Sequence, residues 1–240
     1  KLHSFSDGSM NLPIDSVFYD IFGDDRQKFL KAAQVSDGIW RRPVNVNLLE
    51  IGERKILFDV GSGLNFLPTL GELPAALDAA DVDISAITDV VFTHAHPDHI
   101  WGILDDFDDL LMPDAAYHIS QAEWNFWDSD DALTVMIPGR ESFAVGAKSR
   151  FDKLRDQISF FQGGDEILSS IEAVDTSGHT PGHASFLIHN SAGPVLIAGD
   201  ALTHPVISLE HPEWHDPADM DRGKAALTRK RLLDRLASDK

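Results

Sequence analysis

Residues 93–99 read Thr-His-Ala-His-Pro-Asp-His, a run that sets four potential metal ligands close together: His94, His96, Asp98 and His99. Imidazole nitrogens and carboxylate oxygens are the usual zinc ligands where cysteine is absent, and this chain has no cysteine. A helix would put residues 94 and 96 on different faces, whereas a loop leaving a strand can aim both inward. Asp98 and His99 would then face a neighbouring position. The spacing therefore predicts two adjacent metal ions.

Two further segments place candidate ligands at the ends of other predicted strands. The run GHTPGH, residues 178–183, follows a predicted strand over 171–175, and its two glycines suit a tight loop that aims His179 at the metals. The run Ala-Gly-Asp ends at Asp200, just after a predicted strand over 194–198. Because α/β proteins collect their chemistry at the carboxyl ends of strands, we expect Asp200 to bridge and complete a dinuclear site.

The remaining pattern predicts one α/β domain over residues 1–240, without an internal repeat or a flexible linker. Asp7-Gly8 is interpreted as a turn, and a stripe running from Phe143 to Phe161 as the core face of a helix. Apolar β-branched runs predict strands and amphipathic runs predict helices. The predicted strands are 44–51, 55–60, 86–93, 117–120, 171–175, 184–189 and 194–198, and the predicted helices are 73–80, 121–127 and 219–240.

Composition excludes several classes of protein. The formal net charge is −19, with 20 Lys and Arg against 39 Asp and Glu, which opposes binding to nucleic acid. We find no apolar run long enough to span a membrane, so we expect a soluble protein. The absence of cysteine rules out disulfides and a thiolate nucleophile. The printed sequence starts without an initiator Met, so a cytoplasmic location and a periplasmic or secreted one after removal of a leader both stay open.

The order HxHxDH, GHTPGH and GD resembles the metallo-β-lactamase superfamily across nearly the whole chain. The resemblance implies an αββα four-layer sandwich with the metals at the edges of its two sheets. It implies that His94, His96 and His179 hold one metal, that Asp98 and His99 hold the second, and that Asp200 bridges them. It also implies that Asp59, in the run Asp-Val-Gly, supports the ligands from behind. Two divalent ions are expected, zinc foremost, with manganese, cobalt and iron also compatible.

One departure from the superfamily concerns the second metal. The resemblance implies a last His ligand some way beyond Asp200, and the printed sequence contains none at the expected spacing. We expect a chain trimmed at both ends, with His215 in place of the missing ligand as the alternative.

Individual residues favour one branch of the superfamily over others. His96 stands where redox di-iron members carry a carboxylate, and Asp200 disfavours true β-lactamases. The string THAHPDHIWG is similar to the branch of methyl parathion hydrolase and the quorum-quenching lactonases. That resemblance implies a dinuclear hydrolase whose metal-bound hydroxide cleaves a phosphotriester, lactone or aryl ester, with Asp98 orienting the nucleophile. The alternatives are an N-acyl homoserine lactonase or another amide or thioester hydrolase of the superfamily, and a metal-binding module without turnover.

Aromatic residues after the metal motif predict an apolar substrate wall. Packing in the core or in a dimer explains each of them equally well, and the aromatic-rich insertion suggests a homodimer. The candidate substrate-binding residues are Trp101, Phe126, Trp127 and His204.

Overall fold

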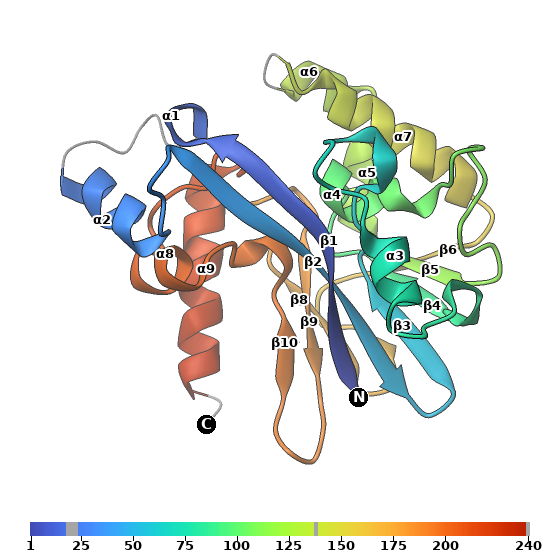
Figure 1. The fold of residues 1–240 in the computed structure, drawn as a ribbon. Coiled ribbons are helices and arrows are strands. Elements are labelled where there is room, and N and C mark those ends of the chain that lie inside the picture. The colour runs from blue at the N-terminus through green and yellow to red at the C-terminus, as the bar shows by residue number, and fades with distance from the viewer. Residues whose placement is uncertain (18–23, 137–138, 239–240) are drawn as a thin grey trace.

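Two β-sheets lie face to face in the computed structural model, which describes residues 1–17, 24–136 and 139–238 (Figure 1). The larger sheet has the order β1-β2-β3-β4-β5-β6, and the smaller has the order β10-β9-β8-β7. Strands β3 to β6 run parallel, whereas the β1–β2–β3 end and the whole smaller sheet are antiparallel. The larger sheet contains β1 (Leu2–Pro13), β2 (Ile39–Ile51), β3 (Arg54–Phe58), β4 (Asp89–Val91), β5 (Ala116–Ser120) and β6 (Ile158–Phe161), and the smaller contains β7 (Glu166–Leu168), β8 (Ile171–Asp175), β9 (Ala184–Ile188) and β10 (Val195–Ile197).

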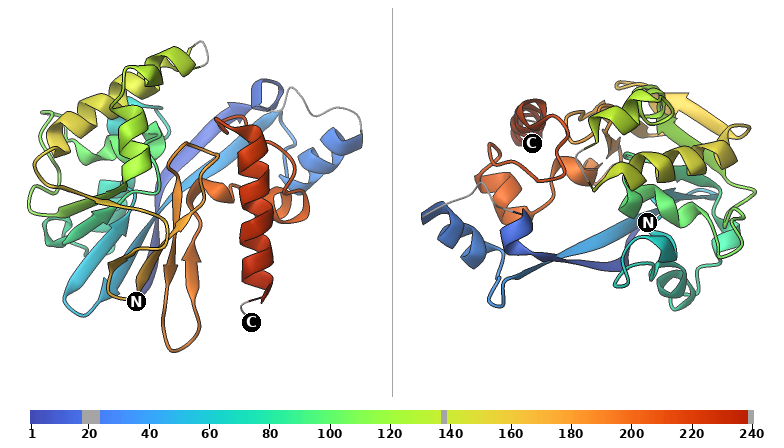
Figure 2. Two further views of the ribbon diagram at one scale, coloured as in Figure 1. Left: turned by 180° about the vertical axis from the view of Figure 1, so that it is seen from behind. Right: turned by 90° about the horizontal axis from the view of Figure 1, so that it is seen from above.

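Helices cover the outer faces of both sheets, which gives four layers (Figures 1 and 2). The helices α3, α4, α5 and α7 lie on the outer side of the larger sheet, α6 packs on α5 and α7, and α9 lies against the smaller sheet. The described helices are α1 (Ile14–Val17), α2 (Asp24–Ala32), α3 (Leu73–Asp78), α4 (Pro97–Ile100), α5 (Gln121–Trp127), α6 (Asp131–Val135), α7 (Glu141–Leu154), α8 (Pro205–Glu210) and α9 (Arg222–Ser238). The predicted αββα sandwich is therefore confirmed.

Two apolar cores follow from these layers. One fills the space between the sheets, where Phe58 of β3 and Phe161 of β6 meet Phe186 of β9. The other lies between the larger sheet and its helices and includes the stacked pair Trp124 and Phe151. Strand β4 is buried on both faces, which suits Val90 and Val91, while its first residue, Asp89, is paired with Arg54. The two cores fix the strand ends from which the candidate ligands project.

Several predicted elements agree closely with the observed ones, and two do not. Helix 121–127 and strand 171–175 have the predicted bounds. Asp7-Gly8 is not a turn: it lies at a register shift inside β1, where the backbone of Gly8 (φ +108°) passes so close to Thr69 that no side chain fits. The stripe from Phe143 to Phe161 is only partly helical, because α7 ends at Leu154 and the last residues form β6.

The structure places the candidate ligands next to strand ends. His94 and His96 lie between β4 and α4, His179 lies between β8 and β9, and Asp200 follows β10. These loops meet at one end of the sandwich (Figure 1). Within the residues that the structure describes, no helix is both long and apolar enough to cross a membrane.

Candidate metal centre

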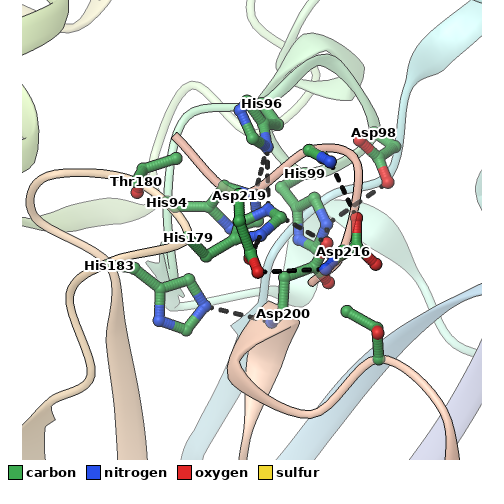
Figure 3. Close-up of polar contacts among 12 residues, drawn as sticks. His94, His96, Asp98, His99, His179, Thr180, His183, Asp200, Asp216 and Asp219 are labelled. Atoms are coloured by element: carbon green, nitrogen blue, oxygen red, sulfur yellow. Dashed lines mark hydrogen bonds and ion pairs between the residues drawn. The ribbon is translucent and has the colours of Figure 1, made fainter. Parts of the chain in front are cut away.

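Three imidazole rings converge at this end of the sandwich (Figure 3). Nδ1 of His96 lies 3.0 Å from Nε2 of His94 and 3.0 Å from Nε2 of His179. Within the described part of the chain, these residues form a set whose ligand atoms all lie within 4.8 Å of one another, and all three rings are buried. We call His94, His96 and His179 the three-histidine group.

Neighbouring side chains orient the rings of His94 and His179. Thr93 donates its hydroxyl proton to Asp59, so its oxygen accepts from Nδ1–H of His94 at 3.0 Å. Nδ1 of His179 donates to Asp219 at 3.0 Å. Both rings are thereby oriented with Nε2 aimed at the centre. Burial, followed by the neighbouring imidazoles, holds the pKa of His94 and of His96 well below its usual value, which keeps both rings neutral. Burial would lower the pKa of His179, but the hydrogen bond to Asp219 and the charge of Asp200 outweigh burial and raise it. A zinc-type cation at the centre would therefore displace a proton from this ring.

The carboxylate half of the site, defined by Asp98, His99 and Asp200, lies beside the three-histidine group (Figure 3). Nε2 of His99 faces Oδ2 of Asp98 at 3.3 Å and Oδ1 of Asp200 at 3.4 Å. His94, His99 and Asp200 form a second set with ligand atoms within 4.8 Å of one another. Oδ2 of Asp200 also lies 3.3 Å from Nε2 of His179, so Asp200 faces both halves, as a bridging ligand must.

Two residues hold the carboxylate half in place. Nδ1 of His99 donates to Oδ2 of Asp59 at 2.8 Å, as predicted for the Asp-Val-Gly run. The backbone N–H of Asp200 donates to Nε2 of His183 at 3.0 Å. Burial lowers the pKa of His183 to about 3, so the ring is neutral and can accept this bond. His183 therefore positions the backbone of Asp200.

Glu123 of α5 joins the two histidine loops, and the sequence analysis did not identify it. Oε1 accepts from the backbone N–H of Ala95 at 2.9 Å and from the indole of Trp127 at 2.6 Å. Oε2 accepts from the hydroxyl of Thr180 and the backbone N–H of Gly182, both at 2.8 Å. The carboxylate is fully buried. One side chain thus links the backbone between His94 and His96 to the loop that carries His179.

Asp219 connects the three-histidine group to the C-terminal helix. Its Oδ1 accepts from His179, and its Oδ2 accepts from Arg229 of α9 at 3.1 Å. Carboxylate partners of this kind fix the orientation of a ligand and raise its basicity. No local pattern in the sequence indicates this role, because 40 residues separate Asp219 from His179.

We predict that Asp219→Asn lowers the affinity of the three-histidine group for zinc by about 10- to 100-fold, since outer partners of metal ligands typically contribute that much. Competition with a chromophoric chelator measures the affinity. Asp221→Asn is the matched control, because Asp221 is exposed and caps α9 through a bond to Lys224 that asparagine also makes. Equal affinity in the two variants would show that Asp219 does not support the ligand.

An apolar cavity of about 720 Å³ reaches the three-histidine group at His96. This volume lies in the range of small-molecule sites. Phe143 contributes to its wall and also contacts the ring of His96, with centroids 5.8 Å apart. Charged side chains of Arg140, Asp221, Arg222 and Lys224 also line the cavity. Its apolar lining includes Phe126, Val135, Met136, Phe143, Pro181 and Met220.

The four predicted substrate-binding residues occupy different places. Phe126 lines the cavity. Trp127 is fully buried behind His96 and donates to Glu123, so it supports the wall without lining it. Trp101 packs between Phe66 and Arg150 in the core. His204 lies near Trp40 in a separate small cavity. The structure therefore places only Phe126 where the prediction expected all four.

Comparisons with known proteins agree with this architecture. Residues 39–240 match the family model described as the metallo-beta-lactamase superfamily. The uncharacterized protein YobT of Bacillus subtilis (strain 168) is 30% identical over 159 residues, which cover 66% of this chain and 62% of YobT. The match thus spans less than two thirds of that relative's length.

Two solved structures share the fold over nearly the full chain. AidC, a dizinc quorum-quenching lactonase in complex with the product N-hexanoyl-L-homoserine, is 26% identical with a TM-score of 0.89, over 99% of this chain and 83% of AidC. The hydrolase AbOPH in the beta lactamase superfamily is 24% identical with a TM-score of 0.86, also over 99% of this chain and 83% of AbOPH.

Proposed function

This chain belongs to the metallo-β-lactamase superfamily of metal-dependent hydrolases, and on that premise we propose that it binds two divalent metal ions, zinc foremost, and hydrolyses lactones. The observation that carries the proposal is the convergence of three buried imidazoles at the wall of a largely apolar cavity of about 720 Å³. The cavity suits an acyl or aryl group whose ester bond lies against His96. The similarity to AidC supports a lactone ahead of a phosphotriester.

The candidate ligands form one set for each of the two ions. His94, His96 and His179 would hold one ion, and Asp98, His99 and Asp200 would hold the second, with Asp200 shared. When bound, the two cations would supply Lewis-acid activation of water and of the ester carbonyl. Every other contribution comes from the protein, which orients the ligands, excludes bulk water and places the substrate.

Asp98 is suited to act on the attacking water. Burial would raise the pKa of its carboxyl group, but the charge of His99 and their hydrogen bond outweigh burial and lower it. A bound cation would favour the ionised form of this carboxyl group as well. An oxygen that the ion leaves free can accept a hydrogen bond from water, which orients the water's oxygen toward the substrate carbonyl.

We predict that an N-acyl homoserine lactone is hydrolysed with a kcat/KM at least about tenfold above that of an aryl phosphotriester. We also predict that kcat/KM rises up to about fourfold for each methylene added to the acyl chain. Each methylene buried in an apolar cavity contributes about 0.8 kcal/mol, which corresponds to that factor. A series from butanoyl to decanoyl lactone, assayed beside an aryl phosphotriester, measures both ratios.

The variant Phe126→Ala should reduce the gain per methylene, because Phe126 lines the cavity. Phe107→Ala is the matched control, since Phe107 is 84% exposed and lies outside the cavity. A dependence on chain length that Phe126→Ala leaves unchanged would assign the acyl group to another surface. Inactivity toward both substrates would point to a different ester or an amide.

A further inference from the structure

The two halves of the metal centre differ in the charges that surround them. The three-histidine group consists of imidazoles, with Asp219 as the outer partner of His179, and Asp59 reaches His94 only through Thr93. The carboxylate half combines Asp98 and Asp200, and a protein cation is already bound there. That cation is Arg42 of β2, whose Nη2 lies 2.5 Å from Oδ2 of Asp200.

Arg42 is held firmly in this position. Its Nη1 donates to Oδ2 of Asp216 at 3.2 Å, and its guanidinium lies 5.9 Å from the ring centroid of Trp40. The residue is only 8% exposed. Since an arginine side chain keeps its charge at any pH that the protein survives, the positive charge beside Asp200 is permanent.

A small cation can reach the same carboxylates. A cavity of about 340 Å³ is lined by Arg42, Asp98, His99 and Asp200, among other residues. An ion that enters there meets Oδ1 of Asp200, which faces His99, while the guanidinium holds Oδ2 of the same carboxylate, so the ion must displace the guanidinium or accept its repulsion at short range. Oδ2 of Asp200 also lies 3.3 Å from Nε2 of His179, so the guanidinium occupies an oxygen that faces both halves. Besides Asp200 the carboxylate half offers Asp98 and His99, whereas the three-histidine group offers three imidazoles, so the second ion depends more on freeing Asp200.

We propose that Arg42 is a resident counter-cation of the carboxylate half, which makes the metal centre load in sequence: the three-histidine group fills first and the second ion competes with the guanidinium for Asp200. This inference rests on the proposed metal binding. It identifies Arg42 as a residue that sets the affinity for the second ion and thereby the metal concentration at which the dinuclear form exists.

Isothermal titration of zinc into chelator-stripped protein tests the proposal without an activity assay. The wild-type chain should give two resolved binding steps. In Arg42→Met the second step should tighten by about 5- to 150-fold, the usual size of a coupling between two sites. The first step should tighten by a smaller factor, because three imidazoles hold its ion without Asp200. Arg42→Lys, which keeps the positive charge, should retain the weak second step.

Arg41→Met is the matched control. Arg41 is the adjacent residue of the same strand, but its side chain is 59% exposed and pairs with Asp37, so both steps should be unchanged. Asp216→Asn provides an independent variant that keeps Arg42. It removes the other partner of the guanidinium, so Arg42 should hold Asp200 more tightly and weaken the second step further.

The outcomes separate the two proposals. A normal first step with a second step that Arg42→Met leaves unchanged or weakens would overturn the role of Arg42 alone. Absence of any binding to the wild-type chain would overturn the metal site itself, and the proposed function with it. If Arg42→Met does not fold, as judged by circular dichroism, a second step that is stronger in Asp216→Asn than in wild type would still overturn the inference.

Discussion

Replacing His96 with alanine is expected to lower the rate of ester hydrolysis by at least about 100-fold and to release the ion of the three-histidine group. Nδ1 of His96 lies 3.0 Å from the facing nitrogens of both His94 and His179, so this atom closes the group. Loss of an outer partner alone typically costs 10- to 100-fold in affinity or activity, and loss of a ligand costs no less than the upper figure. Turnover of a lactone and zinc per chain, determined by plasma mass spectrometry, give the two readouts.

The matched control is His118→Ala. His118 is also a largely buried histidine with a carboxylate partner, Asp89 at 3.2 Å, but it lies on β5 and belongs to neither half of the metal centre. This variant should keep its zinc and its rate within about twofold of wild type. Circular dichroism should show that both variants keep the fold. An unchanged rate of hydrolysis in His96→Ala would contradict the hydrolase proposal. An unchanged zinc content per chain would show that the three imidazoles do not bind an ion.

The candidate ligands could be predicted because each one follows a strand that its own sequence identifies. His94 and His96 come after the apolar run that forms β4, and Asp200 comes after β10. The carboxyl ends of neighbouring strands meet at one edge of a fold, so residues far apart in sequence could be brought together without knowledge of the tertiary structure. Strand bounds were less accurate, because an apolar run does not show where pairing with a neighbour stops.

The residues that support the ligands were missed for different reasons. Arg42 had a usable signal, because side chains along β2 alternate between the core and solvent. This alternation places Arg42 in the core and Arg41 in solvent. The inward residues are 40, 42, 44, 46 and 48. Glu123 had a weaker one, since it shares a helix face with Trp127 four residues later. Asp219 had none. The packing of α9 brings Asp219 next to His179, and a local sequence pattern does not show packing of that kind.

Glu123→Gln is expected to destabilise the metal-free protein by about 1–3 kcal/mol and to weaken zinc binding, because glutamine cannot accept all four hydrogen bonds. The two donors at Oε1 are N–H groups of Ala95 and Trp127, and neither can accept. The new amide must therefore face the other side, where the hydroxyl of Thr180 can turn to accept but the N–H of Gly182 cannot. A buried N–H without a partner costs about 1–3 kcal/mol.

The effect on the metal follows from where those donors lie. Ala95 separates two members of the three-histidine group, His94 and His96. Gly182 packs so tightly on the backbone of Glu123 that it has no room for a side chain. Loosening this contact lets the His179 loop move relative to the His94–His96 loop, so zinc affinity should fall by about 10- to 100-fold.

Urea unfolding in the presence of chelator isolates the loss of stability, and a competition titration measures the affinity. Glu53→Gln makes the same chemical change at an exposed turn and should alter neither quantity. A lower unfolding midpoint with unchanged zinc affinity would assign Glu123 to folding alone. Loss of affinity beyond what global unfolding explains would show that a single buried carboxylate sets the distance between the two loops that hold the metal.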